Sequence, residues 1–188
     1  VGAGEVLLDL GEDVQDATCI ELMRDFIAKA DLAPLPTDPE FTARAEVSAI
    51  LGRQKGERAV DIRKAMQEVM MDKVSVVRDS TGLSEAQATI RDLRRAHGNV
   101  AIQDRGQTFN TDLMEAMELG YMLDCAETII AGAIAREESR GAHYRADFEQ
   151  RDDQNWLAHT MVYKTSGGLQ MRKKPVTITE YQPKERKY

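Results

Sequence analysis

The feature that most constrains the fold is one long apolar segment, TDLMEAMELGYMLDCAETIIAGAIAREE, which begins at Thr111. Its spacing predicts a helix of about 27 residues, which at 1.5 Å per residue is roughly 40 Å long. Apolar residues occupy more than half of its circumference. A helix of this kind must be buried on most sides, so we expect it to form the centre of a bundle. Asn110 or Thr111 can cap its first turn.

A second apolar stripe precedes this segment. From Glu57, apolar residues recur on one face for about six turns, through Ile62 to Val77, which predicts the first long core helix. The sequence RDSTG, residues 78–82, then predicts a turn.

A shorter helix is predicted between these two. Ser84 and Gln87 have the spacing of a capping box, and apolar residues share one face from there to His97. Gly98 is the residue type that ends a helix in the left-handed conformation.

The two ends of the chain carry other signals. Residues 13–30 have helical spacing, and three Pro between Pro34 and Pro39 then predict a linker. Near the other end the pattern becomes alternating, with Ser166, Gly167 and Gly168 between two β-prone stretches, which predicts a hairpin. The predicted fold is mainly α: a three-helix antiparallel bundle, like a spectrin repeat, with a C-terminal β-hairpin. We expect an N-terminal helix and linker over 1–44, the bundle with a charged loop over 45–160, and the hairpin and tail over 161–188.

The composition is that of a soluble protein. The chain has 188 residues, 42% of them apolar and 30% charged, enough for one domain with a core. Cys19 and Cys125 lie far apart, which argues against a disulfide framework and suits a reducing compartment. Neither a membrane-spanning segment nor a signal peptide is predicted. The net charge of -7 disfavours nucleic acid as a partner.

Residues 136–159, the charged loop, are the densest polar stretch of the chain. They combine four Arg, two His and the only Trp with several acids, directly after the long apolar helix. Such side chains can form bidentate ion pairs and make a rigid surface on which another domain docks. The charged loop is therefore predicted to be an ordered polar interface or a site.

Other chemistries find little support in the residues. Gly2 and Gly4 resemble the start of a dinucleotide fingerprint, but no strand precedes them and Leu7 stands where a third Gly belongs. The three His are on different elements without metal-ligand spacing, so we expect no metal site. Cys125 is predicted to be a small core residue. His143 and His159 near acids could serve acid–base chemistry, although holding the loop in place is the better interpretation.

The string ESRGAHYRADFEQRDDQNWLAHT, residues 138–160, closely resembles the C-terminal signature of succinate dehydrogenase and fumarate reductase flavoprotein subunits. Residues 66–78, MQEVMMDKVSVVR, resemble the first helix of the same region, and residues 109–141 resemble its third. The hairpin and the closing PKERKY also match, so the resemblance covers residues 57–188.

This resemblance implies a C-terminal helical domain that supports a flavin domain and is not itself catalytic. It therefore implies a structural, interface-forming role for Arg136, Glu138, Arg140, His143, Arg145, Asp147, Arg151, Asp152, Trp156 and His159. In the full subunit, FAD and the dicarboxylate are held by the FAD-binding and capping domains, so this chain is expected to hold no catalytic, cofactor or metal residue. The implied partners are those two domains, an iron–sulfur subunit and membrane anchor subunits, at the cytoplasmic face of the membrane. The alternatives are the C-terminal domain of L-aspartate oxidase and a free-standing helical interaction module.

Overall fold

The structure, a computed structural model, describes residues 17–30, 34–106 and 108–184. The chain divides into two compact units, Val1–Thr42 and Ala43–Tyr188. In the first unit, α2 spans Ala17–Lys29 and confirms the described part of the predicted N-terminal helix. The Gly2–Gly4 segment lies outside the described residues.

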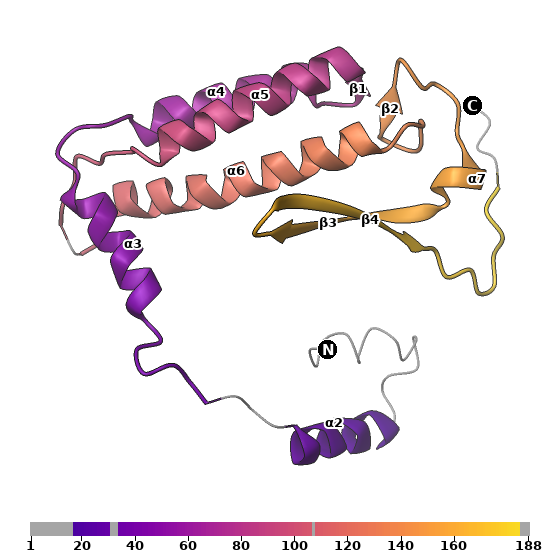
Figure 1. Cartoon of the computed structure of the whole chain (residues 1–188), viewed down its shortest axis with the longest axis horizontal. Helices are drawn as coiled ribbons and strands as arrows, with labels where there is room; N and C mark the ends of the chain where they lie inside the picture. Colours follow the sequence, from indigo (N-terminus) through magenta and orange to yellow (C-terminus); the bar gives the residue numbers. More distant parts are fainter. Residues whose placement is uncertain (1–16, 31–33, 107, 185–188) are drawn as a thin grey trace. The chain divides into compact units, whose positions relative to one another are not determined.

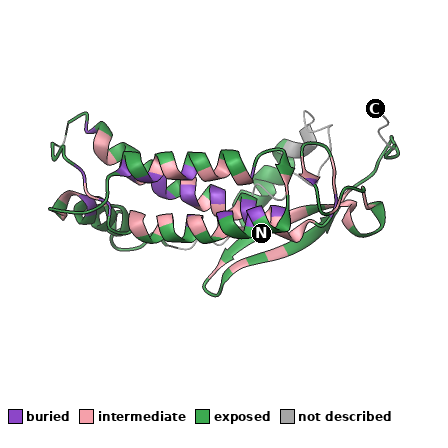
Figure 2. Cartoon of the chain, turned by 90° about the horizontal axis from the view of Figure 1, so that it is seen from above, coloured by how far each residue is buried: buried purple, intermediate pink, exposed green. Residues whose placement is uncertain are grey.

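The second unit is built around three helices. They are α4 (Ala59–Lys73), α5 (Ser80–His97) and α6 (Thr111–Ala135), and each packs against the other two (Figure 1). Buried residues gather where the helices face one another, and exposed residues cover the outer sides (Figure 2). The buried residues of α6 repeat at helical spacing: Ala116, Leu119, Leu123, Ala126, Ile130 and Ala133. The expected mainly helical fold is therefore confirmed.

Helix α6 agrees closely with the prediction at its start. The side chain of Asn110 accepts a hydrogen bond of 2.8 Å from the backbone N–H of Leu113, which caps the first turn. The prediction that α6 is buried on most sides is wrong, however. Met114, Tyr121 and Ile129 are exposed, because α5, α4 and the hairpin cover only part of the circumference of α6.

The start of α5 differs from the prediction. Ser84 and Gln87 do not form the first turn, because the helix begins one turn earlier with Asp79 as its N-cap. The Asp79 carboxylate accepts a 2.8 Å hydrogen bond from the N–H of Gly82, which is the usual action of an Asp cap. The segment predicted as a turn is therefore the first turn of a helix.

The end of α5 also differs. Gly98 has a φ of -55° and is right-handed, so the predicted left-handed cap is wrong. The chain instead tightens after the helix, with Asn99 N–H donating to Ala96 O (2.9 Å) and Val100 N–H to His97 O (3.0 Å). These tighter hydrogen bonds satisfy the last carbonyls without a left-handed residue.

Helix α4 is shorter than predicted. It ends at Lys73, and Val77–Arg78 form the short strand β1, which pairs in parallel with β2, Tyr144–Arg145. The β-branched residues after Lys73 favour this extended conformation. An additional helix, α3 (Phe41–Gly52), was not predicted, because its apolar residues follow no helical stripe and Ile50 is its only buried residue.

The predicted hairpin is confirmed. Strands β3 (Ala158–Thr165) and β4 (Gly168–Pro175) pair antiparallel, and Thr165 lies opposite Gly168. Gly168 has a φ of 105°, which favours glycine at the turn. Both strands contact α6, so the hairpin packs on the helices as expected. Within the described residues no helix is long and apolar enough to cross a membrane.

A close backbone approach at Gly56 generates a test of this fold. A Cβ added at Gly56 would lie 2.0 Å from the carbonyl oxygen of Asn99, where Glu57 and Val100 form a bridge. We expect Gly56→Ala to lower the free energy of unfolding by about 3 kcal/mol, because one backbone must move and lose hydrogen bonds. Chemical denaturation measures this loss.

Gly52→Ala is the matched control, since nothing lies within 4 Å of a Cβ at that position. Its stability should equal or slightly exceed that of the wild type. Equal stability of the two variants would contradict the close approach at Gly56.

Candidate functional site

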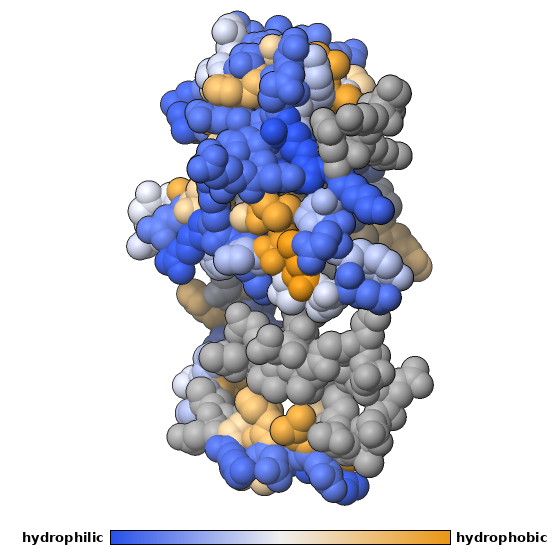
Figure 3. Space-filling model, turned by 90° about the vertical axis from the view of Figure 1, so that its right-hand side faces the viewer, coloured by the Kyte–Doolittle hydropathy of each residue, from blue (hydrophilic) through white to orange (hydrophobic). Residues whose placement is uncertain are grey.

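The charged loop begins where α6 ends and leads through β2 and the short helix α7, Asp153–Trp156, into β3 (Figure 1). Figure 3 looks at the end of the molecule that carries these elements, and its surface is mostly hydrophilic with a few apolar side chains between. All ten residues assigned a role from the sequence lie in this loop or at the start of β3.

Arg145 is the most deeply buried cation of the loop, with 2% of its surface exposed. Its Nη1 donates to the carbonyl oxygens of Ala133 (2.8 Å) and Arg136 (3.2 Å), at the C-terminal end of α6. Its Nε and Nη2 form a two-pronged pair with Asp147, at 2.8 and 2.9 Å. One guanidinium therefore satisfies helix carbonyls that would otherwise lack donors and binds a carboxylate.

Asp147 binds Ser80, the first residue of α5, and so connects Arg145 to that helix. Its Oδ2 accepts a hydrogen bond of 2.9 Å from the backbone N–H of Ser80 and another from the Ser80 hydroxyl. Hydrogen bonds from Arg145 and then from Ser80 hold the pKa of Asp147 well below its usual range. The end of α6 and the start of α5 are thus joined through one Arg and one Asp.

Glu138 is the buried anion of the loop, with none of its surface exposed. It accepts hydrogen bonds from Arg136, from Arg140 (2.8 and 3.0 Å) and from the N–H of Asp152 (2.8 Å). Burial by itself would raise the pKa of Glu138, but the hydrogen bonds from Arg140 and Asp152 outweigh it and lower the pKa. A buried carboxylate with this set of donors stays ionised.

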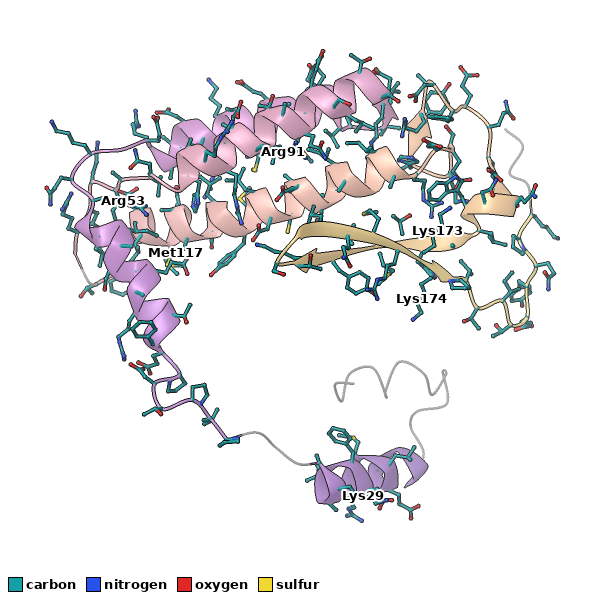
Figure 4. The ribbon with its side chains drawn as sticks, in the orientation of Figure 1. Lys29, Arg53, Arg91, Met117, Lys173 and Lys174 are labelled. Atoms are coloured by element: carbon teal, nitrogen blue, oxygen red, sulfur yellow. The ribbon has the colours of Figure 1, made fainter. Side chains whose placement is uncertain are left out.

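Arg136 links the helix end to the hairpin. It donates to Thr160 Oγ1 (3.1 Å) and to the carbonyl oxygens of Trp156 (3.1 Å) and Ala158. Its guanidinium lies 5.3 Å from the centre of the Trp156 ring. Lys173 Nζ lies 3.4 Å from the centre of the same ring. Figure 4 shows Lys173 on the side of the hairpin toward α6. The indole is therefore fixed by two cations from different elements.

A second ion-pair group lies at the outer side of the loop. Asp153 accepts hydrogen bonds from Arg151 (2.7 and 2.6 Å) and from Arg140 (2.6 Å). These pairs lower the pKa of Asp153 to about 2, with Arg151 as the larger cause. Arg151 also donates to the carbonyl oxygen of Lys184, at 2.9 Å, which attaches the tail. Asp152 caps α7 by accepting from the N–H of Asn155 at 3.0 Å.

His143 has a defined hydrogen-bonding state. Its Nδ1 lies 2.8 Å from Nη1 of Arg78, which can only donate, so Nδ1 is the acceptor. Its Nε2, 3.1 Å from the carbonyl oxygen of Arg136, is then the protonated nitrogen. Burial, together with the charges of Arg78 and Arg145, lowers the pKa of His143 despite that carbonyl contact. The imidazole is therefore neutral and oriented.

His159 is separate from this network. It is exposed on β3, opposite Lys174 of β4, and the structure gives its side chain no hydrogen bond among the described residues. A shallow cavity of about 340 Å³ nevertheless brings it together with other predicted residues. The lining includes Arg136, Arg140, His143, Trp156, His159 and Val176.

The site's contacts serve to hold elements together. The charged groups of the loop's interior are paired with one another or with helix ends, which leaves no free base beside a nucleophile there. Among the described residues, no three metal-ligating side chains gather. The described strands form two separate two-stranded sheets, and the parallel pair β1–β2 is only two residues long. Asp79, rather than a glycine-rich turn, joins β1 to α5, so this pair lacks the long strand and glycine turn that hold a flavin diphosphate. These residues do not fit a flavin site.

Sequence reasoning missed three participants. Ser80, Arg78 and Lys173 complete the contacts of Asp147, His143 and Trp156, yet they lie in other elements. Ser80 is 67 residues away from Asp147, and no local pattern connects them. The prediction for Cys125 was wrong: it is exposed, because it lies on a side of α6 that the other described elements of the second unit leave uncovered.

The contacts of Arg145 predict its contribution to stability. Arg145→Met should lower the free energy of unfolding by about 3–5 kcal/mol, because Asp147 loses its buried partner and α6 loses donors to its carbonyls. Denaturant unfolding of the purified chain provides the value. Arg151→Met is the matched control from the more exposed ion pair, and its loss should be much smaller. Similar losses in both variants would argue against the role of Arg145.

The lowered pKa of His143 predicts a pH dependence. A group with a lower pKa in the folded state binds fewer protons when folded, so acid favours unfolding. The contribution of His143 is complete above its unfolded pKa, about pH 6.5, and is lost as the pH falls toward the folded value. The melting temperature should fall between about pH 7.5 and pH 5.5, and His143→Gln should reduce that fall. His159→Gln should keep the wild-type fall, and a His143→Gln profile as steep as the wild type would refute the assignment.

Comparison with known proteins identifies the family. The family model for the fumarate reductase flavoprotein C-terminal region matches residues 63–188. The fumarate reductase flavoprotein subunit of Mycobacterium tuberculosis is 45% identical over 136 residues, which is 72% of this chain and 23% of that protein. The succinate dehydrogenase flavoprotein subunit of Rickettsia felis is 38% identical over 120 residues, 63% of this chain and 20% of that protein.

A solved structure shows the same fold. The chain is similar to a structure of E. coli quinol fumarate reductase, with a TM-score of 0.77 and 29% identity, covering 88% of this chain and 29% of that one. The chain spans a fifth to a quarter of the length of the two relatives named above. On the matched residues and the shared fold, it belongs to the family of C-terminal domains of fumarate reductase and succinate dehydrogenase flavoprotein subunits.

Proposed function

We propose that this chain is the C-terminal domain of an FAD-dependent flavoprotein subunit that oxidises succinate to fumarate or catalyses the reverse reaction. The match of residues 63–188 to the family model carries this proposal. In the full subunit, electrons pass through FAD to an iron–sulfur subunit and a quinone, which places the protein in the tricarboxylic acid cycle or an electron transport chain. The family match favours this function over L-aspartate oxidase and over a free-standing helical module.

The role of this domain is structural. The interior of the charged loop is occupied with its own ion pairs, so it holds α5, α6 and the hairpin in one arrangement. Its outer members, among them Arg151, Trp156 and His159, remain partly or fully accessible for contact with the FAD-binding and capping domains. Rigid pairing before docking reduces the side-chain entropy lost on docking.

The finer geometry and the surroundings belong to the same proposal. We propose that α4, α5 and α6 form an antiparallel three-helix bundle of the spectrin-repeat kind, and the contacts of each helix with the other two support this. One similar structure is a quinol-fumarate reductase with menaquinol molecules, which supports the proposed exchange of electrons with a quinone. We propose an iron–sulfur subunit and membrane anchor subunits as the further partners. We place the subunit at the cytoplasmic face of the membrane, attached through those partners.

The full subunit provides the test. Expressed from its complete reading frame, it should show a flavin absorbance spectrum and succinate-dependent reduction of a dye acceptor. A product that binds no flavin and shows no such activity would refute the proposed function.

Arg140→Ala in the full subunit tests the non-catalytic role. The pair with buried Glu138 is lost, so the flavin-loaded subunit should inactivate at a lower temperature. At a temperature where flavin content equals that of the wild type, KM for succinate and kcat should be unchanged, because Arg140 does not contact substrate. A raised KM at equal flavin content would make Arg140 part of the active site.

A further inference from the structure

The shallow cavity of about 340 Å³ beside the charged loop is lined by four basic side chains, two of which are fully engaged. Arg136 directs its Nε, Nη1 and Nη2 at acceptors of the protein itself. Both ring nitrogens of His143 have partners as well. Neither residue has a nitrogen left over for a ligand, so any free donor in the cavity comes from the other two.

Arg140 and His159 are the lining residues that retain free donors. Arg140 directs its Nε and Nη2 at Glu138 and Asp153, whereas its Nη1 has no acceptor among the described residues. That nitrogen is accessible to solvent, because Arg63 Nε is the one buried side-chain nitrogen or oxygen without a partner in the described part of the chain. The imidazole of His159 is exposed and has no hydrogen bond there, so its ring N–H is also free to donate.

The charges around the cavity favour an anion. No acidic residue lines it. Lys174 lies opposite His159 in the hairpin, and Lys173 lies over the Trp156 ring and donates to the carbonyl oxygen of Asn155. Neither lysine pairs with a carboxylate of the described residues, while the acids of the loop are already paired with arginines. The cavity therefore has positive charge close by that the described residues do not neutralise.

The rest of the lining decides what kind of anion fits. Trp156, Leu157, Ala158 and Val176 form an apolar wall. A phosphate or sulfate would turn some of its oxygens toward that wall, where they would lack donors. A carboxylate has two oxygens for the two free donors, and an apolar body attached to it would cover the wall. The volume lies at the lower end of the range of roughly 300–1,000 Å³ for small-molecule sites.

We infer that this cavity binds a small monocarboxylate with a branched apolar body. Arg140 Nη1 and His159 hold the carboxylate, and Trp156 and Val176 contact the body. This binding is independent of the proposed function, because every group that it uses belongs to the described chain.

Trp156 provides a local readout, because it is the only Trp of the sequence and lines the cavity. Isovalerate, a branched monocarboxylate that does not absorb where Trp is excited, is titrated into the purified 188-residue chain. We expect a saturable change of Trp fluorescence with a Kd of roughly 1 mM, which suits so small a ligand. Isovaleramide has the same shape without the charge, and it should bind at least about tenfold more weakly.

Two variants locate the site. His159→Ala and Arg140→Gln should each weaken isovalerate binding at least about fivefold, because each removes one of the two free donors. His159 has no hydrogen bond among the described residues, so its variant keeps the test valid if Arg140→Gln fails to fold. Arg91→Gln is the matched control: it removes one positive charge from the exposed surface of α5 and should bind isovalerate like the wild type.

Three results on the chain would overturn the inference: no saturable change, equal binding of isovaleramide, or binding that both variants leave unchanged. The full flavin-loaded subunit adds a fourth test, in which saturation-transfer NMR observes isovalerate directly. If His159→Ala does not reduce the transfer there, the rest of the subunit fills the cavity and the site is not available in the enzyme. A subunit without flavin or succinate-dependent activity would refute the proposed function alone.

Discussion

The buried guanidinium of Arg145 is the interaction on which the arrangement of the loop depends. A helix end inside a protein leaves carbonyl oxygens without donors, and burying them unpaired would be costly. Arg145 supplies those donors to α6 and, through Asp147, fixes the first turn of α5. The pairing of β1 with β2 includes Arg78 opposite Arg145, so the strand contact and the ion pair fix the same register.

The second buried charge of the loop, Glu138, fixes the position of the hairpin through Arg136. Glu138 gathers Arg136 and Arg140, and Arg136 then reaches the backbone of Trp156 and the side chain of Thr160. Buried ion pairs add little net stability compared with apolar contacts, but breaking one leaves a charge without a partner. Their effect here is therefore geometric. Misplacing the hairpin or α7 would remove the hydrogen bonds that Arg136 donates to Thr160 and Trp156 and the one that Glu138 accepts from Asp152.

Local sequence signals predicted the elements, and long-range contacts decided their limits. The apolar period of residues 111–135 and the glycine pair of the hairpin were sufficient for α6 and for β3–β4. The start of α5 was not predictable in the same way, because Ser80 is held by Asp147 from a distant segment as well as by the local cap Asp79. Composition alone marked the charged loop as ordered, but which Arg pairs with which acid depends on how α6 ends, and no sequence spacing encodes that.

The wrong prediction for the burial of α6 has a different cause. It also distinguishes what the apolar and the charged surfaces of this domain contribute. A helix that is apolar on most sides was expected to be buried by this chain alone, yet Tyr121 and Ile129 are exposed. An apolar pattern in the sequence predicts that a surface is shielded from water. It does not identify the part of the protein that covers that surface. The loop's buried charges satisfy one another and so contribute mainly orientation, whereas the side of α6 that carries Tyr121 and Ile129 has apolar area to exclude from water. Under the proposed function, the apolar side of α6 would supply affinity for the rest of the subunit, and the paired loop would supply the register in which the domains meet.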